Sequence, residues 1–281
     1  MAILSEEQTM LRDMAREWTK KENPVGAFRK MRDGDFDGGF DPAVYGQMAE
    51  MGWTGVIIPE DQGGSDFGYM SLGLVLEETG RSLTASPLLA SALGAASALI
   101  LGGSDAQKEA WLPKIASGEA IGTLAIDEGP RHDPSKCDTS VSDGKLSGTK
   151  MFVPEGMSAG LFVVSAKDGV YLVDGSADGI TRSDRSLVDQ RGWAEISFDG
   201  VPAEKLENGG EDLLDQVLDR ARIGAAAEML GMASEAFDVT LAYLKQRVQF
   251  NQVLSSFQAL QHRMADLFGE IELMRSAVET A

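Results

Sequence analysis

A run of helix-forming residues from Glu211 to Arg247 restricts the folds open to this chain more than any other segment. A helix of about 35 residues is about 50 Å long, which is unusual in a compact domain and typical of a helical bundle. A second helix follows, which we expect Ser255 or Ser256 to cap, and it continues to Ala281. Two such helices need further helices, from a partner or from additional chain, to bury their apolar faces. The apolar residues of the first recur at spacings of one, three or four: Leu213, Leu214, Val217, Leu218, Ala221, Ala225 and Met229.

The first part of the chain, residues 1–120, is predicted to be helical. Ser5, followed by two acidic residues, is a predicted helix start. Asp41 and Pro42 form an N-cap and first-turn pair that opens another helix. Asp105 is the predicted N-cap of a later helix. The further helices are expected at residues 70–81, 86–101 and 105–115.

From about residue 121 the pattern changes to short runs rich in Val, Phe, Thr and Tyr, separated by Gly and Asp. These runs are residues 122–126, 139–141, 145–147, 161–165, 170–173 and 195–198. Short alternating runs with regular turns predict an antiparallel sheet that forms a small barrel or a sandwich. We therefore expect an α+β, multidomain protein, with a helical N-terminal domain (1–120), a middle β domain (121–207) and a C-terminal bundle of long helices (208–281).

Composition excludes several classes of function. The formal net charge is −19, from 25 basic and 44 acidic residues, so the chain should repel nucleic acid and anionic membranes. The longest apolar tract, residues 88–101, falls short of the roughly 20 residues that span a bilayer. Cys137 is the only cysteine, which fits a reducing cytoplasm. His132 and His262 show no zinc spacing, and the acidic N-terminus does not resemble a secretory signal. We expect a soluble, cytoplasmic protein without a metal.

The most distinctive motif joins the two long helices. It reads Arg247-Val-Gln-Phe-Asn-Gln-Val-Leu-Ser-Ser-Phe-Gln-Ala-Leu-Gln-His-Arg-Met-Ala-Asp266. This motif resembles the signature of acyl-CoA dehydrogenases, Arg-x-Gln-Phe-Gly-x-Pro followed by Phe-Gln, Gln-His and Ala-Asp. Asn251 replaces the usual Gly, and Val253 the usual Pro. Further stretches at residues 48–64, 77–81 and 107–119 also resemble this family, so the resemblance covers the entire chain.

The resemblance implies a shared cofactor. Acyl-CoA dehydrogenases are FAD-dependent oxidoreductases that remove two hydrogens from an acyl-CoA thioester, and this helix junction reaches the FAD of a neighbouring subunit. Arg247 would then pair with the FAD pyrophosphate. Gln249 and Gln258 would supply hydrogen bonds, and Phe250 would pack against the adenosine end. The alternative is that Arg247 caps the helix C-terminus and Phe250 fills the core.

The resemblance also implies that this chain has lost a flavin pocket of its own. The family strand Tyr-x-Val-Thr-Glu-Pro reads Leu-Ala-Ile-Asp127-Glu128-Gly here, and Lys-x-Trp-Ile-Thr reads Lys150-Met-Phe152-Val-Pro154. Asp127 brings a carboxylate to the place of a Thr hydroxyl. Pro154 removes a hydroxyl and a backbone N–H donor, and Phe152 replaces the Trp. Each lost donor or added charge costs about 1–3 kcal/mol in a buried site.

No catalytic base is expected in this chain. Ala221, before Arg222, stands where some family members carry a catalytic Glu, and the chain stops before the region where others carry it. We therefore expect a degenerate subunit of a heteromer. A homologous acyl-CoA dehydrogenase chain would own the flavin and the base, as in bacterial enzymes of steroid breakdown. The substrate would be a bulky acyl-CoA such as a steroid-CoA, and an electron-transfer acceptor would take the electrons.

Two alternatives stay open. One is a complete homotetrameric acyl-CoA dehydrogenase whose base lies beyond residue 281. The other is a non-catalytic scaffold subunit that keeps the fold for assembly alone.

Overall fold

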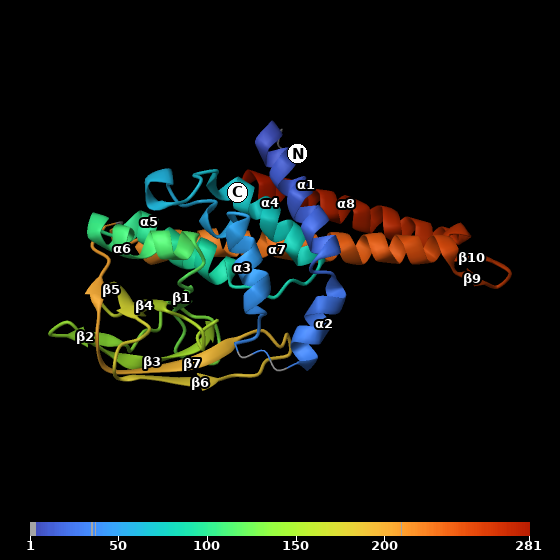
Figure 1. The fold of residues 1–281 in the computed structure, drawn as a ribbon. Helices are drawn as coiled ribbons and strands as arrows, with labels where there is room; N and C mark the ends of the chain where they lie inside the picture. The colour runs from blue at the N-terminus through green and yellow to red at the C-terminus, as the bar shows by residue number, and fades with distance from the viewer. Residues whose placement is uncertain (1–3, 35, 37, 209) are drawn as a thin grey trace. The chain divides into compact units, whose positions relative to one another are not determined.

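The computed structural model describes residues 4–34, 36, 38–208 and 210–281. Along the chain, helices are followed by short strands and then by two long helices, in the order that the sequence predicts (Figure 1). The chain divides into two compact units, each described by itself below. The first unit comprises residues 4–28, 73–84 and 223–281, and the second comprises residues 29–72 and 85–222. Three helices contribute residues to both units: α2 (Val25–Asp33), α4 (Gly68–Arg81) and α7 (Leu213–Gln246).

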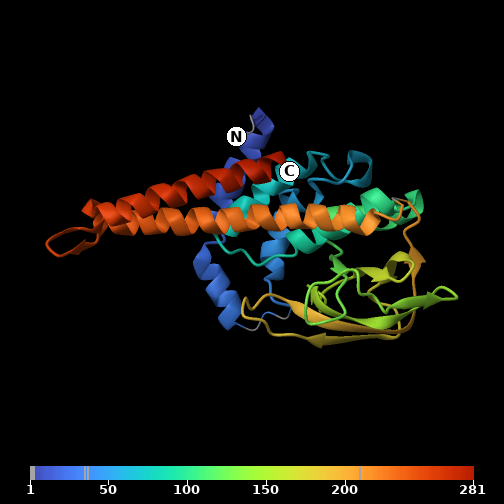
Figure 2. The same cartoon turned by 180° about the vertical axis from the view of Figure 1, so that it is seen from behind.

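The first unit is helical. Its other elements are α1 (Glu6–Lys21), β9 (Val248–Gln249), β10 (Gln252–Val253), the 3-10 turn η4 (Leu254–Ser256) and α8 (Gln258–Thr280). Helices α7 and α8 run side by side, and β9 and β10 join them at one end (Figures 1 and 2). Ser5 caps α1 as predicted, because its Oγ accepts the Gln8 N–H and the Gln8 side chain accepts the Ser5 N–H.

Helix α8 begins differently from the prediction. Its N-cap is Phe257, which makes no side-chain capping bond, whereas Ser255 and Ser256 lie in η4. The Ser256 hydroxyl donates instead to the Val253 carbonyl oxygen at 2.7 Å. The serine hydroxyl therefore stabilises the tight turn before the helix rather than the helix itself.

Close contact between α4 and α7 depends on two glycines. A Cβ at Gly80 would lie 2.1 Å from the Glu228 carbonyl oxygen, and a Cβ at Gly231 would lie 1.9 Å from the Glu77 carbonyl oxygen. Side chains at these positions would force the helix backbones apart. Gly80 lies within the stretch 77–81 that resembles the known family, so a packing requirement accounts for part of that motif.

The helices of the second unit confirm most of the predicted helix starts. They are α3 (Pro42–Glu50), the 3-10 turns η1 (Trp53–Gly55) and η2 (Glu60–Gln62), the π-helix η3 (Leu88–Ala95), α5 (Ala96–Gly102) and α6 (Asp105–Ala116). Asp41 caps α3 by accepting the Ala43 N–H at 2.8 Å. The predicted N-cap Asp105 is wrong by one residue. Ser104 is the cap, because it forms a reciprocal pair of hydrogen bonds with Gln107.

Two open sheets of four strands form the β part of the second unit. Their orders are β1-β4-β5-β8 and β2-β3-β7-β6. The strands are β1 (Gly122–Ala125), β2 (Ser140–Ser142), β3 (Lys145–Pro154), β4 (Leu161–Ala166), β5 (Gly169–Asp174), β6 (Ile180–Asp184), β7 (Trp193–Pro202) and β8 (Glu204–Lys205). The pairing of β1 with β4 is parallel, which differs from the predicted antiparallel sheet. Strands β6 and β8 were not predicted.

The core of the β part lies between the two sheets. Phe162 of β4 meets Phe198 of β7 edge to face, with ring centroids 5.7 Å apart, and both belong to one buried apolar cluster. All six residues of β4 are buried, so its sequence is nearly continuously apolar, whereas buried and partly buried residues alternate along the first half of β7. Of the two predicted forms, the open sheets therefore correspond to the sandwich.

Candidate functional site

The four predicted cofactor-contacting residues lie together at one end of the α7–α8 pair. Arg247 directly follows α7, Gln249 lies in β9, Phe250 follows β9, and Gln258 is the first residue of α8. All four residues are exposed. We call residues 247–258 the hairpin tip. The tip therefore presents a cation, two amides and an aromatic ring to whatever lies beside it.

The turn of the hairpin tip is strained. Gln249 pairs with Gln252, so that Phe250 and Asn251 are the two turn residues, with φ angles of 51° and 62°. Positive φ at both positions is the pattern of a type I′ turn. Asn tolerates this conformation, as predicted, but an aromatic residue there costs about 1 kcal/mol or more. The Phe250 ring is 83% exposed and meets Phe257 edge to face at 6.1 Å. The expectation that Phe250 fills the core is wrong.

The backbone of Arg247 closes the hairpin and leaves its side chain available. Its N–H donates to the Tyr243 carbonyl oxygen at 2.9 Å, and its carbonyl oxygen accepts the Leu254 N–H at 2.8 Å. The guanidinium makes no hydrogen bond or ion pair with any residue that the structure describes. A planar guanidinium with five donors binds a phosphate or carboxylate in a bidentate manner. Arg247 is thus suited to an anionic group outside this chain.

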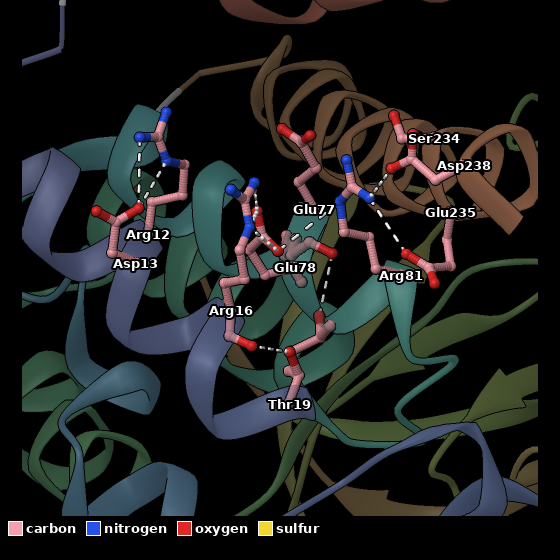
Figure 3. Close-up of polar contacts among 12 residues, drawn as sticks. Arg12, Asp13, Arg16, Thr19, Glu77, Glu78, Arg81, Ser234, Glu235 and Asp238 are labelled. Carbon is pink, nitrogen blue, oxygen red and sulfur yellow. Dashed lines mark hydrogen bonds and ion pairs between the residues drawn. The ribbon is translucent and has the colours of Figure 1, made fainter. Parts of the chain in front are cut away.

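Buried ion pairs fix the helices that carry the hairpin tip (Figure 3). Glu78 of α4, whose side chain is almost fully buried, accepts hydrogen bonds from Arg16 of α1, the shortest at 2.6 Å. Arg81, one turn further along α4, donates to Glu235 at 3.2 Å and to Asp238 at 3.0 Å, both on α7. Removing one partner of a buried pair costs about 3–5 kcal/mol, so α4 is firmly joined to α1 and α7.

Helix α8 is held by a separate ion pair. Arg275 donates to Glu77 of α4 at 2.6 Å and to Ser234 of α7 at 3.4 Å. Burial opposes the charge of Arg275, but the hydrogen bond and charge of Glu77 outweigh it and raise the pKa of Arg275. Ile271 is the one residue of α8 that is fully buried. Much of the attachment of α8 therefore depends on this pair.

The strands predicted to line a flavin pocket are brought together in the second unit. The Met151 N–H donates to the Asp127 carbonyl oxygen at 2.7 Å, and the Thr123 hydroxyl donates to the Pro154 carbonyl oxygen at 2.5 Å. Phe152 lies at an irregularity in the pairing of β3 with β7 and has a φ of 52°. A bulge of this kind redirects the side chains around it.

The carboxylate of Asp127 is already occupied. One oxygen accepts the Asp133 N–H at 2.9 Å, and the other lies 2.8 Å from His132 Nδ1. The loop that follows β1 therefore folds back over Asp127 and satisfies its charge within the chain. A threonine hydroxyl donates a hydrogen bond, whereas this carboxylate accepts them, so Asp127 does not replace such a donor.

A buried ion pair next to this loop was not predicted. Lys150, whose side chain is fully buried, donates to Glu128 at 2.6 Å, to the Ile126 carbonyl oxygen at 3.0 Å and to Ser165 at 3.0 Å. Glu128 also accepts the Thr139 hydroxyl at 2.6 Å. Burial opposes the ionisation of Glu128, but these hydrogen bonds outweigh it and lower its pKa to about 2. The pair holds the loop after β1 in place.

The same loop walls a hollow of about 760 Å³. Arg131, Lys136 and Glu128 are among the charged residues of its wall. Glu128 is neutralised by Lys150, and Lys136 pairs with Asp133 at 2.8 Å. Because most of its charges are paired, the hollow does not strongly attract either anions or cations.

The position expected for a base offers no proton-accepting group. Ala221 lies on α7 between two arginines. Arg220 lies over the ring of Tyr69 at 5.1 Å, and Arg222 pairs with Asp219 at 2.7 Å. Among the described residues, no group of three or more side chains is arranged to hold a metal ion, and no helix is both long and apolar enough to cross a membrane.

Comparisons with known proteins identify relatives along most of the chain. The family model "Acyl-CoA dehydrogenase, N-terminal domain" matches residues 5–119, and "Acyl-CoA dehydrogenase, C-terminal domain" matches residues 208–281. The chain is 33% identical over 302 residues to YngJ, a probable acyl-CoA dehydrogenase of Bacillus subtilis, covering 98% of this chain and 78% of that protein.

Two solved structures illustrate the structural similarity. The Tcur3481-Tcur3483 steroid ACAD has a TM-score of 0.88 and 32% identity, over 97% of this chain and 76% of that chain. An acyl-CoA dehydrogenase from Geobacillus kaustophilus has a TM-score of 0.87 and 26% identity, over 99% of this chain and 78% of that chain.

Proposed function

Because the chain belongs to the acyl-CoA dehydrogenase family, we propose that it is the subunit of a heteromeric enzyme that completes a partner's FAD site. Enzymes of this family use FAD to oxidise the α and β carbons of an acyl-CoA thioester. In the proposed enzyme, a homologous chain holds most of the flavin and supplies the base. Arg247, Gln249, Phe250 and Gln258 of this chain bind and orient the same flavin.

The observation that carries the proposal is the state of the hairpin tip. Its guanidinium has no partner among the described residues, and its aromatic ring is exposed on a strained turn. Strain and exposure of this kind persist where a contact outside the chain uses them. A pyrophosphate suits Arg247, because a charge-assisted bidentate bond is strong even in a chain of net charge −19.

The residues of the second unit do not fit a flavin of their own. Asp127 offers a carboxylate that the loop has already satisfied, and Pro154 carries no N–H to donate. Phe152 lies at a bulge rather than in a regular strand. These features favour a partner-held flavin over one held by this chain alone.

The likeness to the Tcur3481-Tcur3483 steroid ACAD supports the finer parts of the proposal. Its printed name joins two chains and a steroid substrate class. On that basis we assign this chain to a heteromer that oxidises a bulky acyl-CoA, such as a steroid-CoA, and passes the electrons to an electron-transfer acceptor. Ala221 has no acid–base chemistry, which fits a base supplied by the partner.

The test measures flavin in the chain alone and in the complex. The chain is purified by itself, and also after co-expression with a homologous acyl-CoA dehydrogenase chain of the same organism. We expect little absorbance at flavin wavelengths from the chain alone and bound FAD in the complex. Arg247→Ala should release FAD while the complex stays assembled. Lys245→Ala removes a nearby exposed cation and is the matched control, which should keep its FAD.

Each outcome separates the alternatives. Stoichiometric FAD in the isolated chain contradicts the proposal, because the flavin would then have a complete pocket here. Unchanged FAD in an assembled Arg247→Ala complex indicates a scaffold subunit instead. Dehydrogenase activity of the isolated chain would indicate that it carries a base of its own.

A further inference from the structure

An ordered apolar stripe lies on α7, away from the hairpin tip. Its residues are Met229, Met232, Ala236, Val239 and Tyr243, and we call them the α7 stripe. The spacings of three, four, three and four place all five on one face of the helix. Met229 is 64% exposed, Val239 59% and Tyr243 56%, and Ala236 is also exposed.

The arrangement of the α7 stripe indicates what kind of surface it fits. Scattered exposed apolar residues are normal on a protein surface, but these follow the heptad spacing by which one helix packs against another. Ala236, the smallest of the five, lies at the centre of the stripe with larger side chains on either side. A helix packed here can therefore place a large apolar side chain opposite Ala236.

Helix α8 carries a second exposed apolar set. Leu267 is 50% exposed, Leu273 69% and Met274 41%. Leu267 and Met274 are seven residues apart, so they lie on the same face of α8. Both helices of the hairpin therefore have apolar positions that further helices would cover, and a pair of helices fits them better than a single strand or loop.

Charge distinguishes between the helix pairs that might be considered as occupants. Residues 223–281 contain seven Asp or Glu and four Lys or Arg, and the whole chain has a net charge of −19. A second copy would bring the same negative charge to the contact, and like charges reduce both the rate and the strength of association. A chain with a neutral or basic packing surface meets no such repulsion.

We propose that the α7 stripe is the docking face for two helices of the homologous partner, with a neutral or basic packing surface, rather than for a second copy of this chain. This inference rests on the proposed function, because the partner is the chain that holds the flavin. It adds the contact face, the central position Ala236 and the charge that the partner requires.

The test compares two alanines of the same helix. Ala236→Glu places a charge in the centre of the α7 stripe, and Ala242→Glu places the same charge at an exposed position on another face. The probe is the tagged homologous chain used above, co-expressed with each variant. We expect Ala236→Glu to reduce the co-purified chain by about tenfold or more, because burying an unpaired carboxylate is costly. Ala242→Glu should stay close to the unchanged chain.

Two results would overturn the inference. One is normal assembly of Ala236→Glu. The other is self-association of the isolated chain in sedimentation velocity that Ala236→Glu abolishes, which would make a second copy the occupant. Thermal melting by circular dichroism checks that both variants fold. The flavin content of Arg247→Ala is measured separately, so that a harmless Ala236→Glu with a flavin-depleted Arg247→Ala refutes the α7 stripe and keeps the proposed function.

Discussion

At the scale of single residues, the pair of Lys150 and Glu128 decides the shape of the loop after β1. The ammonium has no solvent contact, and the carboxylate side chain is 15% exposed. Each group is satisfied by several hydrogen bonds, which is the condition under which a buried charge is tolerated. The pair therefore holds the loop in the position from which His132 and Asp133 contact the Asp127 carboxylate.

Glu128→Gln should destabilise the chain in a manner that depends on pH. The pKa of Glu128 falls from 4.5 to about 2 in the folded chain, so its stabilising effect is present above pH 4.5 and is lost as pH falls towards 2. Glu128→Gln leaves Lys150 unpaired, and the free energy of unfolding at pH 7 should drop by about 3 kcal/mol. Urea unfolding at pH 7 and at pH 3 measures the difference, which should shrink at pH 3.

The double variant Glu128→Gln with Lys150→Met serves as the control. It removes both charges, so it should recover part of the lost stability at pH 7. A single variant as stable as the unchanged chain would contradict the structural role of the pair.

At the scale of elements, the hairpin between α7 and α8 keeps a residue that does not suit its turn. Phe250 has positive φ, where glycine is free of strain. Phe250→Gly should leave the hairpin as stable or raise the free energy of unfolding by up to about 1 kcal/mol. The same change should reduce FAD in the complex, because the exposed ring is lost. Chemical unfolding and the flavin absorbance of the purified complex measure the two effects.

Phe250→Asn is the matched control for the turn. Asn also tolerates positive φ and lacks the ring, so it should lose FAD as Phe250→Gly does while keeping the turn. If both variants keep their flavin, the ring is not a cofactor contact, whatever happens to stability.

Helix ends were largely predictable because capping chemistry is local. Ser5, Asp41 and Pro42 mark real helix starts, and the error of one residue at Ser104 arose because Ser and Asp are both good caps. The capping bonds with Gln107 settle that choice in the structure. Strand β6 carries a single apolar residue, Ile180, so no alternating pattern marks it. Its pairing with β7 forms it.

The candidate site was predictable only in part, for similar reasons. The motif from Arg247 to Gln258 is contiguous, so its residues were found together in the sequence. Exposure of Phe250 depends on the hairpin geometry, which the motif does not encode. Glu128 and Lys150 are 22 residues apart, and only the arrangement of β1 and β3 brings them into contact.

At the scale of the whole molecule, the proposed enzyme is asymmetric. The hairpin tip of this chain serves the partner's flavin, whereas the second unit of this chain does not fit one. In an assembly of equal numbers of both chains, we therefore expect a single FAD for each pair, located in the partner. The two chains differ in the residues at their flavin positions rather than in fold, so the empty position should have no measurable affinity for added FAD.

The flavin stoichiometry tests this asymmetry directly. Native mass spectrometry of the complex gives the number of chains and flavins, and the ratio of flavin to protein absorbance gives the same quantity in solution. Titration with excess FAD is the control for flavin lost during purification and should add none. A flavin bound for every chain would mean that the loop over Asp127 opens to admit one, and the pocket of this chain would then be functional.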